Sequence, residues 1–96
     1  MSDIDLRREH GLDPVQARAM AERLLERLER EFGLRGEWAG NVLRFQRAGV
    51  QGHLALGPGD LHLQVTLGLL LKAMRGRIEQ AIARELDQLF PPARRQ

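Results

Sequence analysis

The residues whose types could do chemistry are few, and two of the three histidines are the most suggestive. His53 and His62 stand on either side of the turn signal Gly57-Pro58-Gly59-Asp60, so we predict that they lie on neighbouring strands, as diagonal neighbours on one polar face. That spacing suits two ligands of one metal ion, but a zinc site needs three or four ligands and the pattern supplies no third. We therefore expect two solvated histidines and no metal site, with His53 and His62 as the candidates to test.

The other residues that could take part in catalysis are isolated. Ser2 is the only serine, and no Gly-x-Ser-x-Gly motif surrounds it. Asp3 and Asp5 would point into water on one strand, where carboxylates are solvated rather than tuned for acid or base chemistry. Cysteine is absent, which excludes thiol catalysis and thiolate metal sites. We interpret His10 as a capping or locally hydrogen-bonded residue, and we expect no catalytic residue, no cofactor and no enzymatic activity.

The charge balance argues against nucleic acid as a partner. Fifteen Lys and Arg residues against thirteen Asp and Glu leave a formal net charge of +2. The isoelectric point of about 10.4 is high because a single Lys and no Tyr or Cys leave almost nothing to titrate just above neutral pH. The central α-β-β-β-α order is similar to that of the double-stranded RNA-binding domain, but the last helix begins with Gly68-Leu69-Leu70-Leu71 rather than with lysines. RNA binding is therefore the least favoured alternative.

The elements that must position these residues begin with a strand and a helix. Residues 3–8 alternate between polar and apolar types, which predicts a strand with one face toward a core. Asp13, Pro14 and Gln16 match the pattern of a helix N-terminus, and Gly33 suits the left-handed position after its last turn. Apolar residues recur between them at helical spacing, namely Met20, Ala21, Leu24, Leu25, Leu28 and Phe32.

From residue 36 to residue 67 the apolar period changes from the helical one to two. Turn signals at residues 39–41, 48–49 and 57–60 divide this stretch into short strands. A second helix follows over about residues 68–90 and ends before Pro91-Pro92. We predict an α+β fold, a two-layer sandwich in which an antiparallel sheet carries two helices on one face, in the order β-α-β-β-β-β-α.

The length of 96 residues fits one domain. We predict that residues 1–96 form a single unit with an ordered core of about 3–90 and a frayed tail at 91–96. No stretch approaches the roughly 20 apolar residues that cross a bilayer, and residues 1–5 lack the pattern of a signal peptide. We therefore expect a cytoplasmic protein without a transmembrane segment.

The second predicted helix has an unusually wide apolar face. Its apolar residues cover an arc of roughly 200°, which is more than packing on one side of a sheet requires. Three interpretations stay open: burial between the sheet and the first helix, a homodimer interface, or an apolar patch at the surface. If the face is a surface patch, Leu70, Leu71 and Met74 are the candidates for surface binding.

Short motifs with a fixed order run along nearly the whole chain, from about Ile4 to Leu89. They are Ile4-x-Leu6-x-Arg8-x-His10, Leu28-x-x-Glu31-Phe32-Gly33-Leu34, Glu37-Trp38-x-Gly40-Asn41-x-Leu43-x-Phe45, Gly49-Val50-x-Gly52, Leu63-x-Val65-x-Leu67-Gly68-x-Leu70-Leu71 and Ile78-Glu79. Together, their order and spacing resemble those of the polyhydroxyalkanoic acid system proteins, a family of small bacterial proteins.

This resemblance implies a place among proteins that make or store polyhydroxyalkanoate, the polyester that bacteria keep as granules, and it designates no catalytic residue. We expect a non-enzymatic accessory or regulatory protein that acts through a binding surface, with the granule or its proteins as partners. The alternatives are a small ligand- or metal-binding module on the polar sheet face, with His53 and His62, and the RNA-binding module.

Overall fold

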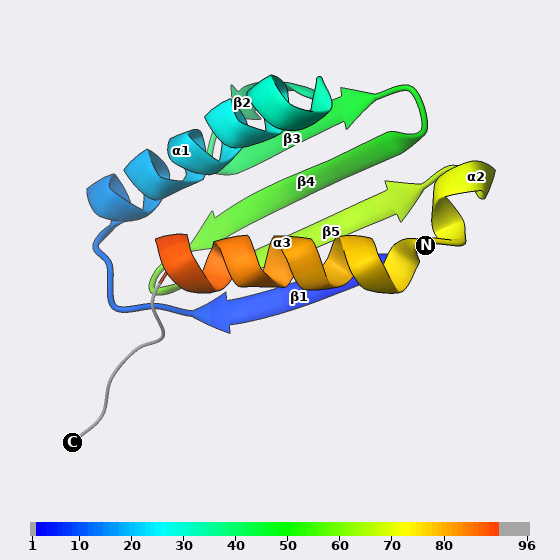
Figure 1. The fold of residues 1–96 in the computed structure, drawn as a ribbon. Helices are drawn as coiled ribbons and strands as arrows, with labels where there is room; N and C mark the ends of the chain where they lie inside the picture. Colours follow the sequence, from blue (N-terminus) through cyan, green and yellow to red (C-terminus); the bar gives the residue numbers. More distant parts are fainter. Residues whose placement is uncertain (1, 91–96) are drawn as a thin grey trace.

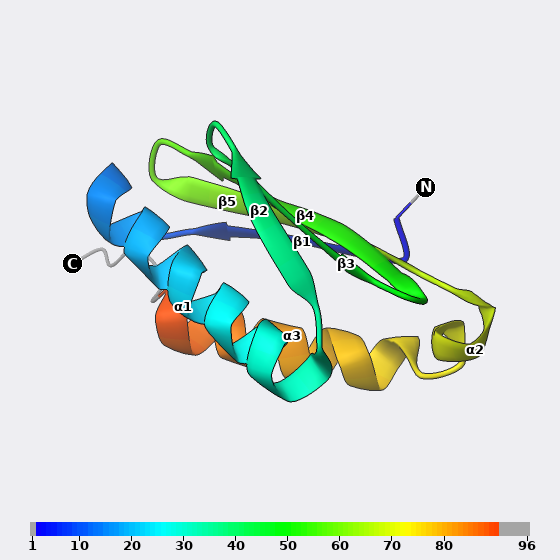
Figure 2. The same ribbon diagram turned by 90° about the horizontal axis from the view of Figure 1, so that it is seen from above.

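The computed structural model describes residues 2–90, which form a five-stranded antiparallel sheet and three helices. The strands lie in the order β1-β5-β4-β3-β2, and α1 and α3 cover the same face of the sheet (Figures 1 and 2). The elements are β1 (Ile4–Glu9), α1 (Pro14–Phe32), β2 (Arg35–Ala39), β3 (Val42–Arg47), β4 (Val50–Gly57), β5 (Asp60–Leu67), α2 (Leu69–Lys72) and α3 (Arg75–Leu89). The α+β fold class is confirmed, whereas the frayed tail predicted for residues 91–96 lies outside the described residues.

The sheet follows from the alternating pattern and its turns. Each of the consecutive strands β2 to β5 pairs with the next through a short turn. Gly49 and Gly59 occupy two of these turns with φ angles of 86° and 83°, a left-handed conformation that favours glycine. β1 adds to the other edge of β5, with Ile4 opposite Val65. The paired residues Leu43, Leu54 and Leu63 form a buried row on the face that carries the helices.

Helix α1 begins and ends as predicted. The Asp13 carboxylate accepts a hydrogen bond from the Gln16 backbone N–H at 2.8 Å, and the Gln16 side chain accepts one from the Asp13 N–H at 3.3 Å. Gly33 ends the helix with a φ angle of 71°, and its N–H bonds to the Glu29 carbonyl at 3.1 Å. Within the apolar stripe, Ala21, Leu24 and Leu28 are buried, Met20 and Leu25 are half-buried, and Phe32 at the end is 50% exposed.

The second predicted helix is two helices instead of one. Helix α2 ends at Lys72 and α3 begins at Arg75, with Met74 between them at φ −107° and ψ 17°. The Met74 N–H bonds to the Leu71 carbonyl three residues earlier at 2.9 Å, which tightens the turn and ends α2. The first turn of α3 contains Gly76, a poor helix former, so continuing one straight helix through this point is disfavoured.

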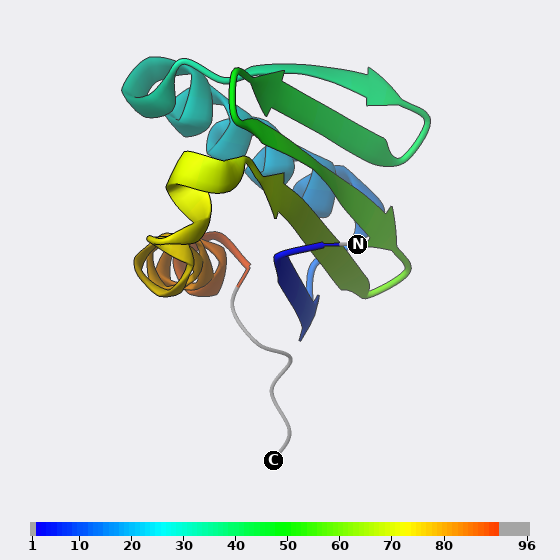
Figure 3. The ribbon, with the colours of Figure 1, turned by 90° about the vertical axis from the view of Figure 1, so that its right-hand side faces the viewer.

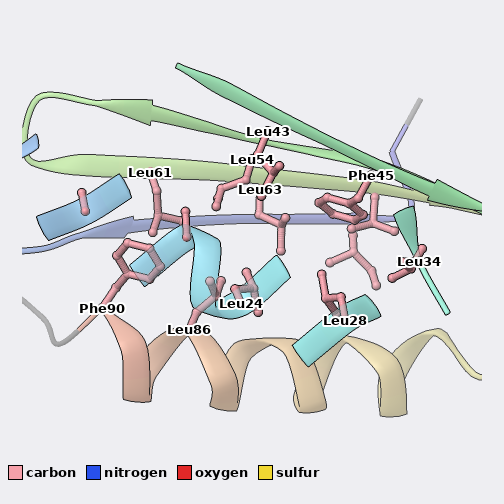
Figure 4. Packing of buried hydrophobic residues seen from close by; sticks show 14 of the residues in the cluster. Leu24, Leu28, Leu34, Leu43, Phe45, Leu54, Leu61, Leu63, Leu86 and Phe90 are labelled. Atoms are coloured by element: carbon pink, nitrogen blue, oxygen red, sulfur yellow. The ribbon is translucent and has the colours of Figure 1, made fainter. Parts of the chain in front are cut away.

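The core lies between the sheet and the two long helices (Figure 4). Figure 4 shows side chains from both layers meeting there, including Leu24 and Leu28 of α1, Leu86 of α3 and Phe45 of β3. The sheet contributes further fully buried leucines, namely Leu43, Leu54, Leu61 and Leu63. This single apolar layer is the core of the predicted two-layer sandwich.

Candidate functional site

Three exposed apolar side chains gather at the end of the molecule where β5 passes into the helices. Leu69 is 87% exposed, Leu70 is 89% exposed and Met74 is 45% exposed. We call these three residues the α2 patch. Helix α2 projects at this end of the fold, away from the turn that joins β4 to β5 (Figures 1 and 3). Isolated exposed leucines are common, whereas here three large exposed apolar residues fall within six positions of the chain.

The sequence-based candidates divide between this patch and the core. Leu70 and Met74 lie on the patch, whereas Leu71 is half-buried and packs against the core. A Cβ atom added to Gly49 would lie 3.6 Å from Leu71 Cδ1, which places this side chain against the turn between β3 and β4. Sequence reasoning missed Leu69. The signal was present, because three consecutive leucines on one helical turn cannot all face the same side.

The α2 patch is held in place by polar contacts with the sheet. Gly68 donates a backbone hydrogen bond to the Gly49 carbonyl at 2.8 Å. Asp3 accepts a hydrogen bond from the Leu67 N–H at 2.7 Å, and its other oxygen lies 3.7 Å from the Lys72 Nζ. The expectation that Asp3 simply faces water was therefore wrong, because its side chain is only 15% exposed and connects β1 to the start of α2.

A groove with an apolar lining runs from the α2 patch into the space between α1 and α3. Its cavity volume is about 580 Å³. The two helices diverge toward this end (Figure 1), and strands of the sheet form the floor. The lining side chains include Leu28 and Phe32 of α1, Val50 of β4, and Ile78 and Ile82 of α3. Met74 belongs both to the lining and to the α2 patch, so the two features are continuous.

The opposite face of the sheet is polar and holds the two histidines. His53 pairs with Gln64 and His62 pairs with Ala55, so the two histidines are diagonal neighbours, as predicted. The His62 ring donates a hydrogen bond to the Asp5 carboxylate at 2.6 Å, and this bond lowers the pKa of Asp5. Within residues 2–90, no group of three or more His, Asp or Glu residues is placed to hold a metal ion.

This polar face is hollowed beside His53. The hollow has a volume of about 710 Å³ and is open to solvent. Polar side chains of β2, β3, β4 and β5 surround it, among them Arg35, Glu37, Arg44, Gln51 and Gln64. The mixture of positive, negative and amide groups makes it suitable for a small polar molecule rather than an apolar one.

His10 lies inside the fold, which the sequence did not indicate. Its ring is 4% exposed, and Nδ1 accepts a hydrogen bond from the Leu12 N–H at 3.2 Å, which confirms the predicted local bond. Its centroid lies 5.5 Å from that of the Phe90 ring. Nε2 is buried and has no hydrogen-bond partner among the described residues. The ring therefore fills space in the core beside the last residue of the described chain.

Comparison with known proteins identifies the family. The model of the polyhydroxyalkanoic acid system proteins (PHA_gran_rgn) matches residues 4–90. The chain belongs to this family. A search of curated proteins and a search of solved structures each found no significant match.

Membership confirms the resemblance seen along the sequence and links the protein to the polyhydroxyalkanoate system. The family description names neither a reaction nor a binding mode. The part of the chain that the structure describes also has no helix long and apolar enough to cross a membrane.

Proposed function

We propose that the protein is a non-enzymatic accessory or regulatory protein of polyhydroxyalkanoate synthesis or granules, and that it acts in the cytoplasm by binding the granule surface through the α2 patch. The observation that carries this proposal is the exposure of Leu69 and Leu70, at 87% and 89%, on a turn that projects from the fold. Because the chain belongs to the polyhydroxyalkanoic acid system family, we take the polyester granule as the surface that the patch binds.

The energetics favour such a role for the patch. Full burial of one leucine side chain contributes roughly 1.5–3 kcal/mol relative to exposure. Leu69 and Leu70 gain none of this in the isolated fold, yet the contacts of Gly68 and Asp3 hold their backbone in place. A surface that buries both leucines therefore gains apolar contact without first having to order a flexible segment.

The chemistry beside the patch suits a polyester. A polyester surface offers apolar carbon chains together with ester carbonyl oxygens that accept hydrogen bonds. Lys72 and Arg75 are exposed and are close to the leucines in sequence, and both side chains are hydrogen-bond donors without acceptor groups, although Lys72 also pairs with Asp3. The patch therefore offers apolar side chains for the carbon chains and donors for the carbonyl groups.

Co-sedimentation with polyhydroxyalkanoate particles tests the proposal. Protein-free polymer particles and native granules from a producing strain are mixed separately with the purified protein and centrifuged. We expect the wild-type protein to pellet with the particles and a Leu69→Ser/Leu70→Ser double variant to stay in the supernatant. Binding to native granules alone would make a granule protein the partner of the same patch.

The matched control is Val15→Ser, which removes an 80% exposed apolar side chain from the start of α1. This variant should pellet as the wild type does, and circular dichroism should show all three proteins folded. The proposal is wrong if the wild-type protein stays in the supernatant with both kinds of particle, or if the double variant binds as well as the wild type.

The hollow beside His53 favours a second candidate function, a small ligand- or metal-binding module on the polar sheet face. Titration with zinc followed by calorimetry tests the metal-binding form of this idea. Heat that disappears in a His53→Ala variant would support it. No heat above that of buffer at neutral pH would remove it.

A further inference from the structure

The groove between α1 and α3 is a second apolar feature that the granule proposal does not use. Arg27 of α1 and Glu85 of α3 both line the groove and form an ion pair between the two helices, which diverge toward α2 (Figure 1). Small-molecule sites commonly have volumes of about 300–1,000 Å³, and this groove, at about 580 Å³, lies within that range. Its size suits a molecule much smaller than a protein partner.

The lining of the groove indicates the shape of the occupant. Leu28 and Phe32 form one wall, Ile78 and Ile82 form the other, and Val50 contributes to the floor. These side chains are mostly aliphatic, and they come from both helices and from the sheet. A single alkyl chain lying along the groove would contact both walls and remove their apolar surface from water.

Four arginines and two glutamates line the rim, which leaves a formal excess of two positive charges. Arg27 pairs with Glu85 and lies 4.0 Å from Glu31, so these three groups neutralise one another in part. Arg47 donates to the Phe32 carbonyl at 2.8 Å.

That leaves Arg77 and Arg84, which make no hydrogen bond or ion pair with any residue in the range 2–90. Both belong to α3 and stand seven residues apart, two helical turns, so they extend from the same side of the helix. These two guanidinium groups, which have no partner in the range 2–90, stand beside an apolar groove. Together they are complementary to an anionic head group on an apolar chain.

We propose that this groove binds a single-chain carboxylate amphiphile, with the alkyl chain between α1 and α3 and the carboxylate at Arg77 or Arg84. A free fatty or hydroxyalkanoic acid and the carboxylate end of a polyester chain share this chemistry. The proposal does not depend on binding of the granule through the α2 patch.

Calorimetry with three ligands of equal chain length tests it, with the two acids below their micelle concentrations and decanol below its solubility limit. Decanoate and 3-hydroxydecanoate should bind, and decanol should bind about threefold to tenfold more weakly because it lacks the charge that meets the arginines. An Arg77→Gln/Arg84→Gln variant should bind decanoate as weakly as decanol and should leave decanol binding unchanged. The control Arg23→Gln, on the exposed side of α1 and outside the groove, should bind all three as the wild type does.

Filling the groove tests the placement of the chain. Ala81 lines the groove and is itself exposed, so Ala81→Phe should block decanoate and decanol alike without lowering the melting temperature. Ala19→Phe, at an exposed position of α1 outside the groove, is its control. Hydroxyalkanoate oligomers with a free or a methyl-esterified carboxyl end separate the two sources. If polyester chain ends are recognised, the free-acid oligomer should bind more tightly than its ester, and if the source is a single free acid, neither oligomer should bind as decanoate does.

Calorimetry and sedimentation together distinguish the possible occupants of the groove. Absence of heat with decanoate overturns the proposal, and so does equal affinity for decanoate and decanol in wild type and arginine variant. A chain that sediments as a dimer and binds no decanoate shows that a second copy fills the groove instead. The Leu69→Ser/Leu70→Ser variant should keep its decanoate binding, so failure of the granule proposal and failure of this one are distinguishable.

Discussion

Asp5 is the residue whose pKa is most clearly shifted by the fold. The hydrogen bond from His62 is the main cause that lowers the pKa of the Asp5 carboxyl below its ordinary value of 3.8, and Gln64 donates a longer bond at 3.4 Å. Because the pKa is lowered in the folded state, ionised Asp5 stabilises the fold at pH values above 3.8. This contribution is lost as the pH falls through the lowered pKa.

Asp5→Asn should therefore lower the urea midpoint of unfolding at pH 7, by a small amount because the pair is at the surface. The difference from wild type should shrink as the pH falls below 3.8 and should vanish below the folded-state pKa. Urea unfolding at a series of pH values measures this. Glu9→Gln, on the same strand, is the control, and an Asp5→Asn effect that is equal at every pH would contradict the assignment.

The sequence predicts part of this polar site because the register of a hairpin follows from its turn. The turn at residues 57–60 places His53 and His62 as diagonal neighbours, and the structure agrees. The bond between His62 and Asp5 joins residues 57 positions apart and depends on which strand β1 pairs with. Nothing in the local pattern fixes that choice, so the sequence could not predict the partner of His62.

Among the strands, β4 shows how closely neighbouring strands of the sheet pack together. Gly52 faces the core opposite Phe45, whose ring lies over it. A Cβ atom added at Gly52 would lie 2.6 Å from the Phe45 Cε1 atom and 2.8 Å from the Gln64 carbonyl oxygen. The carbonyl belongs to the paired strand and cannot move without disturbing the ladder.

Gly52→Ala should consequently destabilise the fold by about 1–3 kcal/mol, the usual cost of overpacking a core. Chemical denaturation measures this change. Gly76→Ala is the matched control, because a Cβ at Gly76 in α3 meets no atom within 4 Å and alanine favours a helix. Gly76→Ala should stabilise the protein by roughly 0.5–1 kcal/mol. Equal effects of the two variants would refute the packing argument.

Local signals explain which helices the sequence predicts. Helix α1 has its cap residues and its stripe within one segment, so its bounds follow from local chemistry. The break at Met74 has no comparable signal. Helix α2 is held by Asp3 and Gly49, which are distant in sequence, while α3 packs on α1. The same long-range contacts turn Leu71 inward and leave Leu69 exposed, which the apolar arc alone could not distinguish.

At the scale of the whole molecule, apolar side chains of the last helices have two different environments. Leu86 is fully buried between the two layers, whereas Leu70 is almost fully exposed. Leu86→Ala should cost about 2–5 kcal/mol in the free energy of unfolding because it leaves a cavity. Leu70→Ala should change that energy by less than about 0.5 kcal/mol. Thermal and urea unfolding compare the two, and a large loss in Leu70→Ala would show that the α2 patch is part of the core.

The patch and the groove occupy one end of the molecule and share Met74. The other face of the sheet is polar and carries the His62 contact with Asp5. An apolar surface could therefore approach the α2 end while the polar sheet face stays in water. The place of Arg77 and Arg84 at the rim of the groove depends on how α1 and α3 pack, which no local sequence pattern predicts.

The pairing of β1 with β5 also bears on the order in which the strands dock during folding. Strands β2 to β5 pair through neighbouring hairpins, whereas β1 pairs with a strand about fifty to sixty positions later in the chain, so we expect β1 to dock after them. Contacts so distant in sequence form late in folding. Asp3, which bonds to Leu67 and approaches Lys72, arrives with that strand. Hydrogen exchange should therefore find α2 and β1 opening together, so that the chain presents a fixed α2 patch only once its first strand has docked.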